Sequence, residues 1–333
     1  MAKRRKSRSK KIQPAQLDLY FEADTATAGD SRSYIDTAKE LSKVNRRMYE
    51  QGRMYAYQGL TFIWKQNASG LDAIEVSVRT AGNTWVVHNA FIKGRALWDQ
   101  MQDLVLDDNP SIRGKWHDYK IRLSSQMVTA RILAAKDGAG NDYDVGGWDL
   151  STYVMPQHEV DLTSGLPLPA EEKTAALIGA DTTSIRSLVK AYEESRSTVQ
   201  SPMPNVPVGM SDSFFNLLTD SGSQEPELAD VIEDENDTPP YDLDEYPGSD
   251  TNAPVPVTVG YGAISPQEVD GRIGGFIAPC GLIEIEIRGY SNSLITVENP
   301  NGEVPTADMP TIGLLLHVAP GMYKGTASVP MGQ

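Results

Sequence analysis

The chain has 333 residues, 40% hydrophobic content and a net charge of −15, so it holds enough apolar material for one large core or two moderate ones. Its single cysteine, Cys280, excludes an intramolecular disulfide framework and a cysteine-rich zinc site. No apolar run approaches the roughly 20 residues that a membrane helix needs, and we therefore expect no membrane span.

Positive charge is concentrated at the N-terminus. The first eleven residues carry seven cations and no anion: Lys3, Arg4, Arg5, Lys6, Arg8, Lys10 and Lys11. Without these seven, 23 of the chain's 30 Lys and Arg remain against 45 Asp and Glu, a balance of −22. A run of Lys, Arg and Ser buries too little apolar surface to offset its ordering entropy, so residues 1–30 are predicted to form a disordered basic arm.

The arm predicts binding to a polyanion, and nucleic acid is the obvious partner, because Lys and Arg neutralise phosphates without reading sequence. A nuclear localisation signal and a solubilising tail are the alternative interpretations. We do not expect a signal peptide, because no apolar stretch follows the charges.

An amphipathic helix is predicted from Ser33 to Gln51, within a segment that spans residues 31–52. Ser33 would cap it and Gly52 would end it. Its apolar side chains recur every three or four residues: Ile35, Ala38, Leu41, Val44 and Met48. The opposite face carries four cations, Lys39, Lys43, Arg46 and Arg47. We predict that they extend the nucleic-acid-binding surface of the arm; a solvated charged face is the alternative.

From residue 53 onward the apolar pattern changes to a period of two, and residues 53–333 are predicted to form one β-rich domain. The expected strands are Arg53–Trp64, 74–78, Tyr119–Leu123, Met127–Ala135, Trp148–Met155, Val255–Tyr261, Leu282–Arg288, Leu294–Glu298, Thr311–Val318 and Met322–Ser328. Two further helices are expected, Ala90–Val105 and Thr183–Ser195. Because these strands do not alternate regularly with helices along the chain, the pattern favours a mainly β, antiparallel β-sandwich over a doubly wound sheet.

A long acidic insertion is predicted at about 197–252. No Lys or Arg occurs between Ser197 and Gly271, and residues 220–250 alone contain twelve acids. Such a block repels itself and favours an exposed loop that keeps anionic partners away. Calcium binding is the alternative, but no spacing matches an EF-hand loop.

Catalytic signatures are missing from the sequence. It contains no phosphate-binding glycine loop, no dinucleotide fingerprint, no nucleophile elbow and no His-Glu-x-x-His helix. The four histidines, His88, His117, His158 and His317, are far apart, and the neighbours Asp118 and Glu159 give two of them only weak acid–base pairs. We predict no enzymatic activity, no cofactor and no metal site.

Four stretches resemble a known family. They are SYIDTAKELSKVNRRMYEQGRMYAYQGLTFIW (33–64), NTWVVHNAFIKGRALWDQM (83–101), GKWHDYKIRL (114–123) and LLLHVAPGMYKG (314–325). With the basic arm and the β-rich body, they are similar to capsid proteins of circular Rep-encoding single-stranded DNA viruses from environmental samples. The stretches cover about a fifth of the chain.

The resemblance implies a single jelly roll of eight strands in two four-stranded sheets. It also implies self-assembly into an icosahedral shell of sixty copies or a multiple, around a genome of single-stranded DNA. The protein would then reside in the virion, and in the host nucleus during assembly. Subunit contacts need apolar anchors, for which the candidates are Trp85, Trp116, Trp148, Phe214 and Phe215.

Two other functions stay open at this point. An acidic nucleic-acid- or histone-associated accessory protein would use the acidic insertion as its functional element and the arm as a localisation signal. A lectin-like or sugar-cleaving β-sandwich would need a pair of carboxylates that only geometry identifies.

Overall fold

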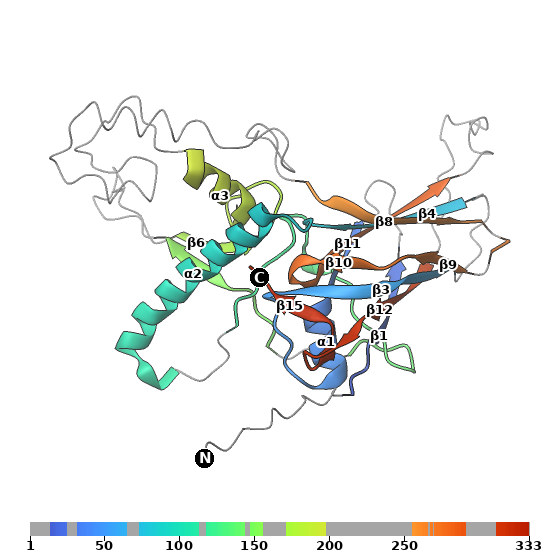
Figure 1. The fold of residues 1–333 in the computed structure, drawn as a ribbon, viewed down its shortest axis with the longest axis horizontal. Helices are drawn as coiled ribbons and strands as arrows, with labels where there is room; N and C mark the ends of the chain where they lie inside the picture. Colours follow the sequence, from blue (N-terminus) through green and yellow to red (C-terminus); the bar gives the residue numbers. More distant parts are fainter. Residues whose placement is uncertain are drawn as a thin grey trace, which may run out of the picture.

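The computed structural model describes residues 14–24, 32–64, 73–112, 118–143, 147–155, 171–197, 255–265, 267–268, 270–290 and 311–332. Over these residues the protein is mainly β, with curled antiparallel sheets that form a half-barrel (Figure 1). The predicted mainly β, antiparallel architecture is therefore confirmed at this level.

Two sheets build the half-barrel. The first contains β1 (Asp18–Asp24), β12 (Thr311–Val318), β3 (Arg53–Trp64), β9 (Asp270–Ile273), β10 (Phe276–Ala278) and β15 (Ser328–Pro330). The second has the order β2 (Arg32–Asp36), β11 (Leu282–Tyr290), β4 (Ala73–Thr80) and β8 (Val257–Ile264). Early strands pair with late ones throughout: β1 with β12, β2 with β11, β3 with β9 and β10, and β4 with β8.

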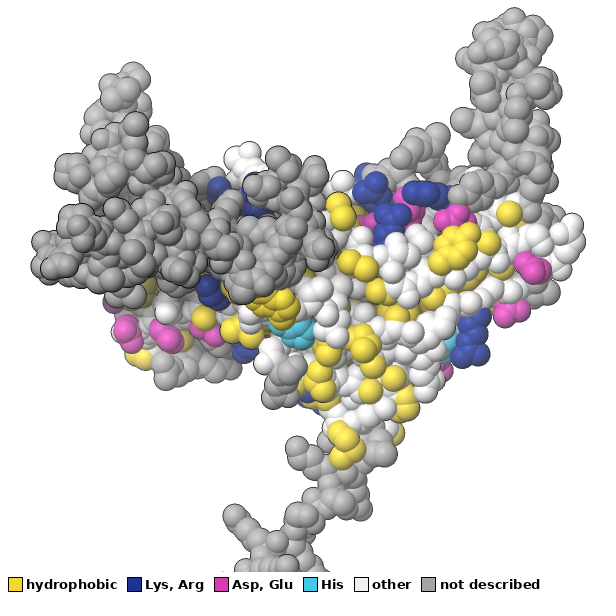
Figure 2. All heavy atoms as spheres, turned by 45° about the horizontal axis from the view of Figure 1, so that its top comes forward, with side chains coloured by type: hydrophobic (Ala, Val, Ile, Leu, Met, Phe, Trp, Pro, Cys, Tyr) yellow, Lys and Arg dark blue, Asp and Glu magenta, His cyan; other side chains and the backbone are white. Residues whose placement is uncertain are grey.

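The outer face of the second sheet carries paired charges. Arg79 on β4 lies 3.3 Å from Glu284 on β11 and also contacts Glu286, which accepts a hydrogen bond from Arg288 at 3.0 Å. Figure 2 shows Lys and Arg side chains beside Asp and Glu side chains toward the upper right of this view, where the top of Figure 1 comes forward. Because Glu284 and Glu286 are buried, these ion pairs compensate charges that would otherwise be costly.

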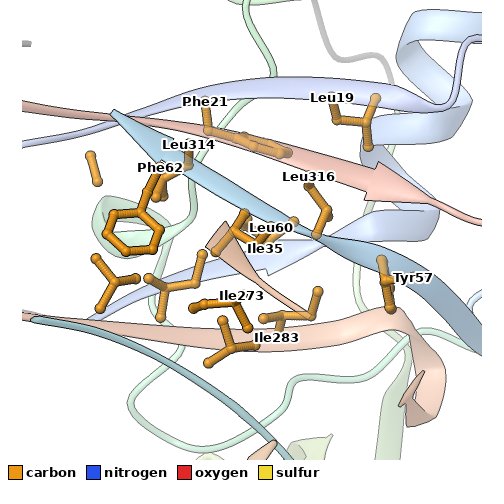
Figure 3. Close-up of a cluster of buried hydrophobic side chains, with 14 of the residues drawn as sticks. Leu19, Phe21, Ile35, Tyr57, Leu60, Phe62, Ile273, Ile283, Leu314 and Leu316 are labelled. Atoms are coloured by element: carbon orange, nitrogen blue, oxygen red, sulfur yellow. The ribbon is translucent and has the colours of Figure 1, made fainter. Parts of the chain in front are cut away.

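The core lies between the two sheets and follows the period of two. Leu19 and Phe21 of β1 and Leu314 and Leu316 of β12 point inward from the first sheet (Figure 3). Ile283, Ile285 and Ile287 of β11 meet them from the second sheet, with at most 1% of each side chain exposed. This shared burial is the dominant stabilising contribution in a sandwich of two sheets.

A second apolar cluster lies beside the half-barrel. It joins α2 (Trp85–Asp108) and α3 (Leu188–Ser197) to a small sheet of β5 (Thr152–Met155), β6 (Glu171–Ala176) and β7 (Ile185–Ser187). Gly94 lets the helices approach closely, because a Cβ atom there would lie 2.7 Å from Leu188. The remaining elements are short: α1 (Thr37–Asn45), β13 (Pro320–Gly321), β14 (Gly325–Thr326) and the 3-10 turns Pro110–Ile112, Thr129–Arg131 and Pro279–Gly281.

Many predicted elements are confirmed. The strands at 53–64 and 311–318 have the predicted bounds, and those at 74–78 and 282–288 lie within longer strands. The strand predicted at 255–261 is shifted to Val257–Ile264. The helix predicted at 90–105 extends from Trp85 to Asp108, because Thr84 caps it by accepting a hydrogen bond from the Val87 N–H. The helix predicted at 183–195 begins only at Leu188, because residues 185–187 pair with β6.

Other predictions are wrong in position. Residues 119–123 and 127–135 are not strands; Arg122 only bridges Ala176, and 129–131 form a 3-10 turn. The strand predicted at 148–155 begins at Thr152, and residues 322–328 turn at Lys324, where φ is +50°. Both 119–123 and 127–135 alternate in the expected way, but each makes only an isolated bridge to a strand, Arg122 to Ala176 of β6 and Ile132 to Tyr34 of β2. The strand predicted at 294–298 and the acidic insertion lie outside the described residues.

The N-terminal boundaries also need correction. Residues 18–24, assigned to the disordered arm, form strand β1 and bury Leu19, Phe21 and Ala23 in the core. Ser33, predicted to cap a helix, lies in strand β2 opposite Ile285. The helix occupies only Thr37–Asn45, and Asp36 is its N-cap. Pairing with β11 thus outweighs the helical periodicity that begins at Ser33.

The alternation on β12 predicts different effects for adjacent leucines. Leu314→Ala removes a fully buried side chain, and we expect the free energy of unfolding to fall by about 2–5 kcal/mol. Leu315→Ala, on the opposite face and only partly buried, is the matched control and should cost clearly less. Equilibrium unfolding in urea measures both; equal losses would contradict the assigned register.

Candidate nucleic-acid interface

The root of the basic arm is fixed to the end of helix α1. The Gln16 N–H donates to Asn45 Oδ1 at 2.7 Å, and Asn45 Nδ2 donates back to the Gln16 carbonyl at 3.0 Å. Arg47 donates from its guanidinium to the Pro14 carbonyl at 3.3 Å. The seven cations of residues 3–11 lie outside the described residues. The chain that carries them therefore joins the body at Pro14 and Gln16, beside Asn45 and Arg47.

The four predicted cations of the helix do not share one open face. Arg46 and Arg47 are exposed and Lys39 is partly buried, whereas Lys43 is 8% exposed. The Lys43 ammonium lies 3.0 and 3.2 Å from the two carboxylate oxygens of Glu40, so its charge is already compensated. Arg46 ends the helix in a left-handed conformation with φ of 53°, the role that the sequence assigned to Gly52.

Two further cations adjoin this end of the helix. The Lys324 ammonium donates to the Met48 carbonyl, and Tyr49 donates from its hydroxyl to the Lys324 carbonyl at 2.9 Å. The Arg53 guanidinium lies 3.7 Å from the ring centroid of Tyr323, with Lys324 5.0 Å from the same centroid. Sequence reasoning missed both residues, because Lys324 is distant in the chain and Arg53 begins a strand.

We call the arm-root surface the set formed by residues 14–17 together with Arg46, Arg47, Glu50, Arg53, Tyr323 and Lys324. It is not uniformly basic, since Glu50 is exposed beside Arg53 at 4.0 Å. Its exposed guanidinium groups suit phosphate oxygens, which they bind through charge and a planar fork of donors. The Tyr323 ring is already covered by cations, so the described part of this surface offers phosphate contacts rather than a stacking platform.

A buried polar network holds α1 in place. Asp36 accepts from the Lys39 N–H at 3.1 Å, from Gln51 Nε2 at 3.0 Å and from Trp148 Nε1 at 2.9 Å. Gln51 in turn bonds to both backbone groups of Ile121. Burial raises the pKa of the Asp36 carboxyl from 3.8 to about 6. Glu40 extends the network, because it accepts from the Ala135 N–H at 2.8 Å.

The other predicted side chains are dispersed. Trp148 lies in the network just described, whereas Trp85 is 44% exposed and contacts Tyr192 edge-on. Trp116, Phe214, Phe215, His117 and His158 lie outside the described residues. Cys280 is fully buried, and burial raises its pKa, so its thiol is not poised as a nucleophile.

One hydrogen-bonded chain on the first sheet resembles a catalytic arrangement. His317 Nδ1 lies 2.7 Å from Asp18, and His317 Nε2 lies 3.1 Å from Thr61 Oγ1. The three side chains come from adjacent strands on the outer face, where the described strands β1, β12 and β3 pair through their backbone groups. We assign it a structural role in holding β1 against β12.

Within the described ranges, no group of three His, Cys, Asp or Glu side chains is arranged to hold a metal ion. No helix among the described residues is long and apolar enough to cross a membrane. Comparison with protein-family models, with curated proteins and with solved structures returned no match.

The structure separates the roles of the four helix cations. We expect a double variant, Arg46→Gln with Arg47→Gln, to fold normally. In a plot of log binding constant against log salt concentration, its slope for single-stranded nucleic acid should be shallower by about 0.7 for each lost phosphate contact. Fluorescence anisotropy across a salt series measures this. An unchanged slope would remove the two arginines from the interface.

Lys43→Gln is the matched comparison within the same helix. It leaves the buried Glu40 carboxylate without its cation, and we expect the free energy of unfolding to fall by about 3–5 kcal/mol. Under conditions where the variant is folded, its salt slope should equal that of the unmodified protein. A shallower slope with normal stability would restore Lys43 to the binding face.

The raised pKa of Asp36 predicts a specific pH dependence. Because the folded-state pKa lies above the unfolded value, the proton-linked stability is present below about pH 4 and is lost as pH rises through about 6. The free energy of unfolding of the unmodified protein, measured relative to that of Asp36→Asn, should therefore fall by roughly 3 kcal/mol between pH 4 and pH 7. Urea unfolding from pH 4 to 7 tests this; a constant difference between the two proteins would contradict it.

Proposed function

We propose that the protein is a viral coat protein that self-assembles into an icosahedral shell and binds the packaged genome through its basic arm. The observation that carries the proposal is the separation of charge: seven cations in the first eleven residues, and a balance of −22 in the remainder. A chain of this kind holds a polyanion at one end and keeps it away from the rest.

The position of the arm supports this proposal. The chain leaves the β-rich body beside Arg46 and Arg47, so a nucleic-acid strand held by the arm meets further exposed cations where the arm joins the body. The Asn45 and Arg47 hydrogen bonds fix the direction in which the chain enters β1. A localisation signal needs only to be accessible and has no need of such a surface.

The strand pairing supports a single jelly roll. We count eight strands in chain order, β1, β2, β3, β4, β8, then β9 with β10 as one broken strand, β11 and β12. The first then pairs with the eighth, the second with the seventh, the third with the sixth and the fourth with the fifth. This is the pattern of one long antiparallel ribbon wrapped into two sheets, as in the jelly rolls of viral capsids and lectins. The virion as location, sixty or a multiple of copies and single-stranded DNA as cargo belong to the same proposal.

Removing the arm tests the proposed role most simply. We expect a variant that lacks residues 1–12 to fold and to lose nucleic-acid packaging, because β1 begins only at Asp18 and its pairs with β12 run from Asp18 to Asp24. Nucleic acid protected from nuclease, measured per mass of particle, is the readout.

A shuffled arm of identical composition is the control, and it should package normally because phosphate contacts carry no sequence information. If the truncated protein packages as much nucleic acid as the intact one, the arm serves only as an address and the proposal fails.

A further inference from the structure

Among the described residues, no segment covers the long edge that strand β8 forms at one side of the second sheet. β8 is the terminal strand of the order β2-β11-β4-β8 and pairs with β4 from Ile264 opposite Ile74 to Val257 opposite Thr80 (Figure 1). In an edge strand, alternate residues direct their N–H and C=O groups away from the sheet. No backbone hydrogen bond from another described segment reaches this outer side of β8.

The opposite edges of the two sheets are covered. The Lys136 N–H donates to the Tyr20 carbonyl of β1 at 2.8 Å, and the Leu133 N–H donates to the Tyr34 carbonyl of β2 at 2.8 Å. One segment, residues 132–136, thus covers the edges of both β1 and β2. On the other side, β9 and β10 are only four and three residues long. Short strands are a common protection against edge-to-edge pairing.

β8 has neither charge nor proline to protect its edge; its one irregularity is a bulge at Val259, between the pairs Thr258–Arg79 and Gly260–Val78. Its eight residues, VTVGYGAI, include no charge and no proline, whereas β1 presents Asp18, Glu22 and Asp24 along its length. Tyr261 is 61% exposed and Val257 39% exposed. Gly260 and Gly262 pack tightly against the core. A Cβ atom at Gly260 would lie 2.3 Å from Ile273, and one at Gly262 would lie 3.0 Å from Phe62. The strand is therefore held firmly in the sheet, while no other described segment pairs with its edge.

We propose that this edge pairs with β8 of a second copy, antiparallel, about a two-fold axis. An antiparallel edge complements itself, because each outward N–H meets a carbonyl of the identical strand. The body of the protein carries a balance of −22, so copies repel one another at most surfaces. β8 brings two copies together without opposing like charges along the strand. This inference deepens the proposed function, since it names one contact of the self-assembly on which it rests.

Opposite charges on the edge test the pairing. One variant carries Thr258→Lys with Tyr261→Lys, and the other carries Thr258→Glu with Tyr261→Glu; Thr258 and Tyr261 lie opposite Arg79 and Ser77 of β4 and are both exposed. We expect each variant alone to self-associate about tenfold more weakly than the unmodified protein, because like charges then meet across the axis. Mixing the two should restore association, as measured by sedimentation velocity. Ile63→Lys, on a partly exposed position of β3 within the first sheet, is the control and should associate normally.

The outcomes separate this inference from the proposed function. If the unmodified protein assembles and both edge variants assemble equally well, the β8 contact is wrong while the coat function stands. If the unmodified protein stays monomeric, both are wrong. Should the variants not fold, hydrogen exchange of the unmodified protein decides: the outward amides of β8 must become protected on assembly, and unchanged exchange there overturns the inference.

Discussion

The pairing of early strands with late strands is the constraint on which the structure depends. β1 pairs with β12 and β2 with β11, so one outer strand of each sheet, β1 or β2, is placed by a strand more than 200 residues later in the chain. The apolar side chains of both sheets then fill one core, with Leu19 and Phe21 contributing from the first strand. Because β1 contributes directly to that core, the arm that precedes it is joined to a strand with buried side chains.

This constraint also organises the electrostatics. The end of α1 holds Gln16 and Pro14 through Asn45 and Arg47, which places the attachment point of the arm beside exposed cations. Beneath the helix, Asp36 and Glu40 are buried. Asp36 accepts hydrogen bonds from Gln51 and Trp148 and Glu40 accepts one from Ala135, and these bonds fix the helix against the body. The interior polar groups therefore position the surface charges, and one of the helix cations, Lys43, belongs to the interior.

Local patterns predicted the central strands well because their side chains alternate between core and outer face. At 53–64 and 311–318 the predicted and observed bounds are identical. The same pattern at 119–123 misled, since alternation indicates burial on one side but does not show whether the segment pairs continuously with a neighbour; here only Arg122 forms a bridge. The helix at Ser33 was misplaced for a related reason: residues 33–35 pair with β11, some 250 residues away, and no local signal carries that information.

The candidate interface was only partly predictable. The arm and the two arginines follow from charge and spacing, whereas the partnership of Lys43 with Glu40 required knowledge of which helix face is buried. Lys324 reaches the same place through β12 and the turn at 323–326, so only the fold brings it beside Met48, the residue after Arg47. Edge exposure of β8 likewise follows from strand order and cannot be read from VTVGYGAI alone.

The most direct test of the central claim is negative-stain electron microscopy of the purified full chain, combined with extraction of nucleic acid after nuclease treatment. A coat protein should give closed shells of uniform size that contain protected nucleic acid. A population of monomers or small oligomers without protected nucleic acid, under conditions where the protein is folded, would contradict the account.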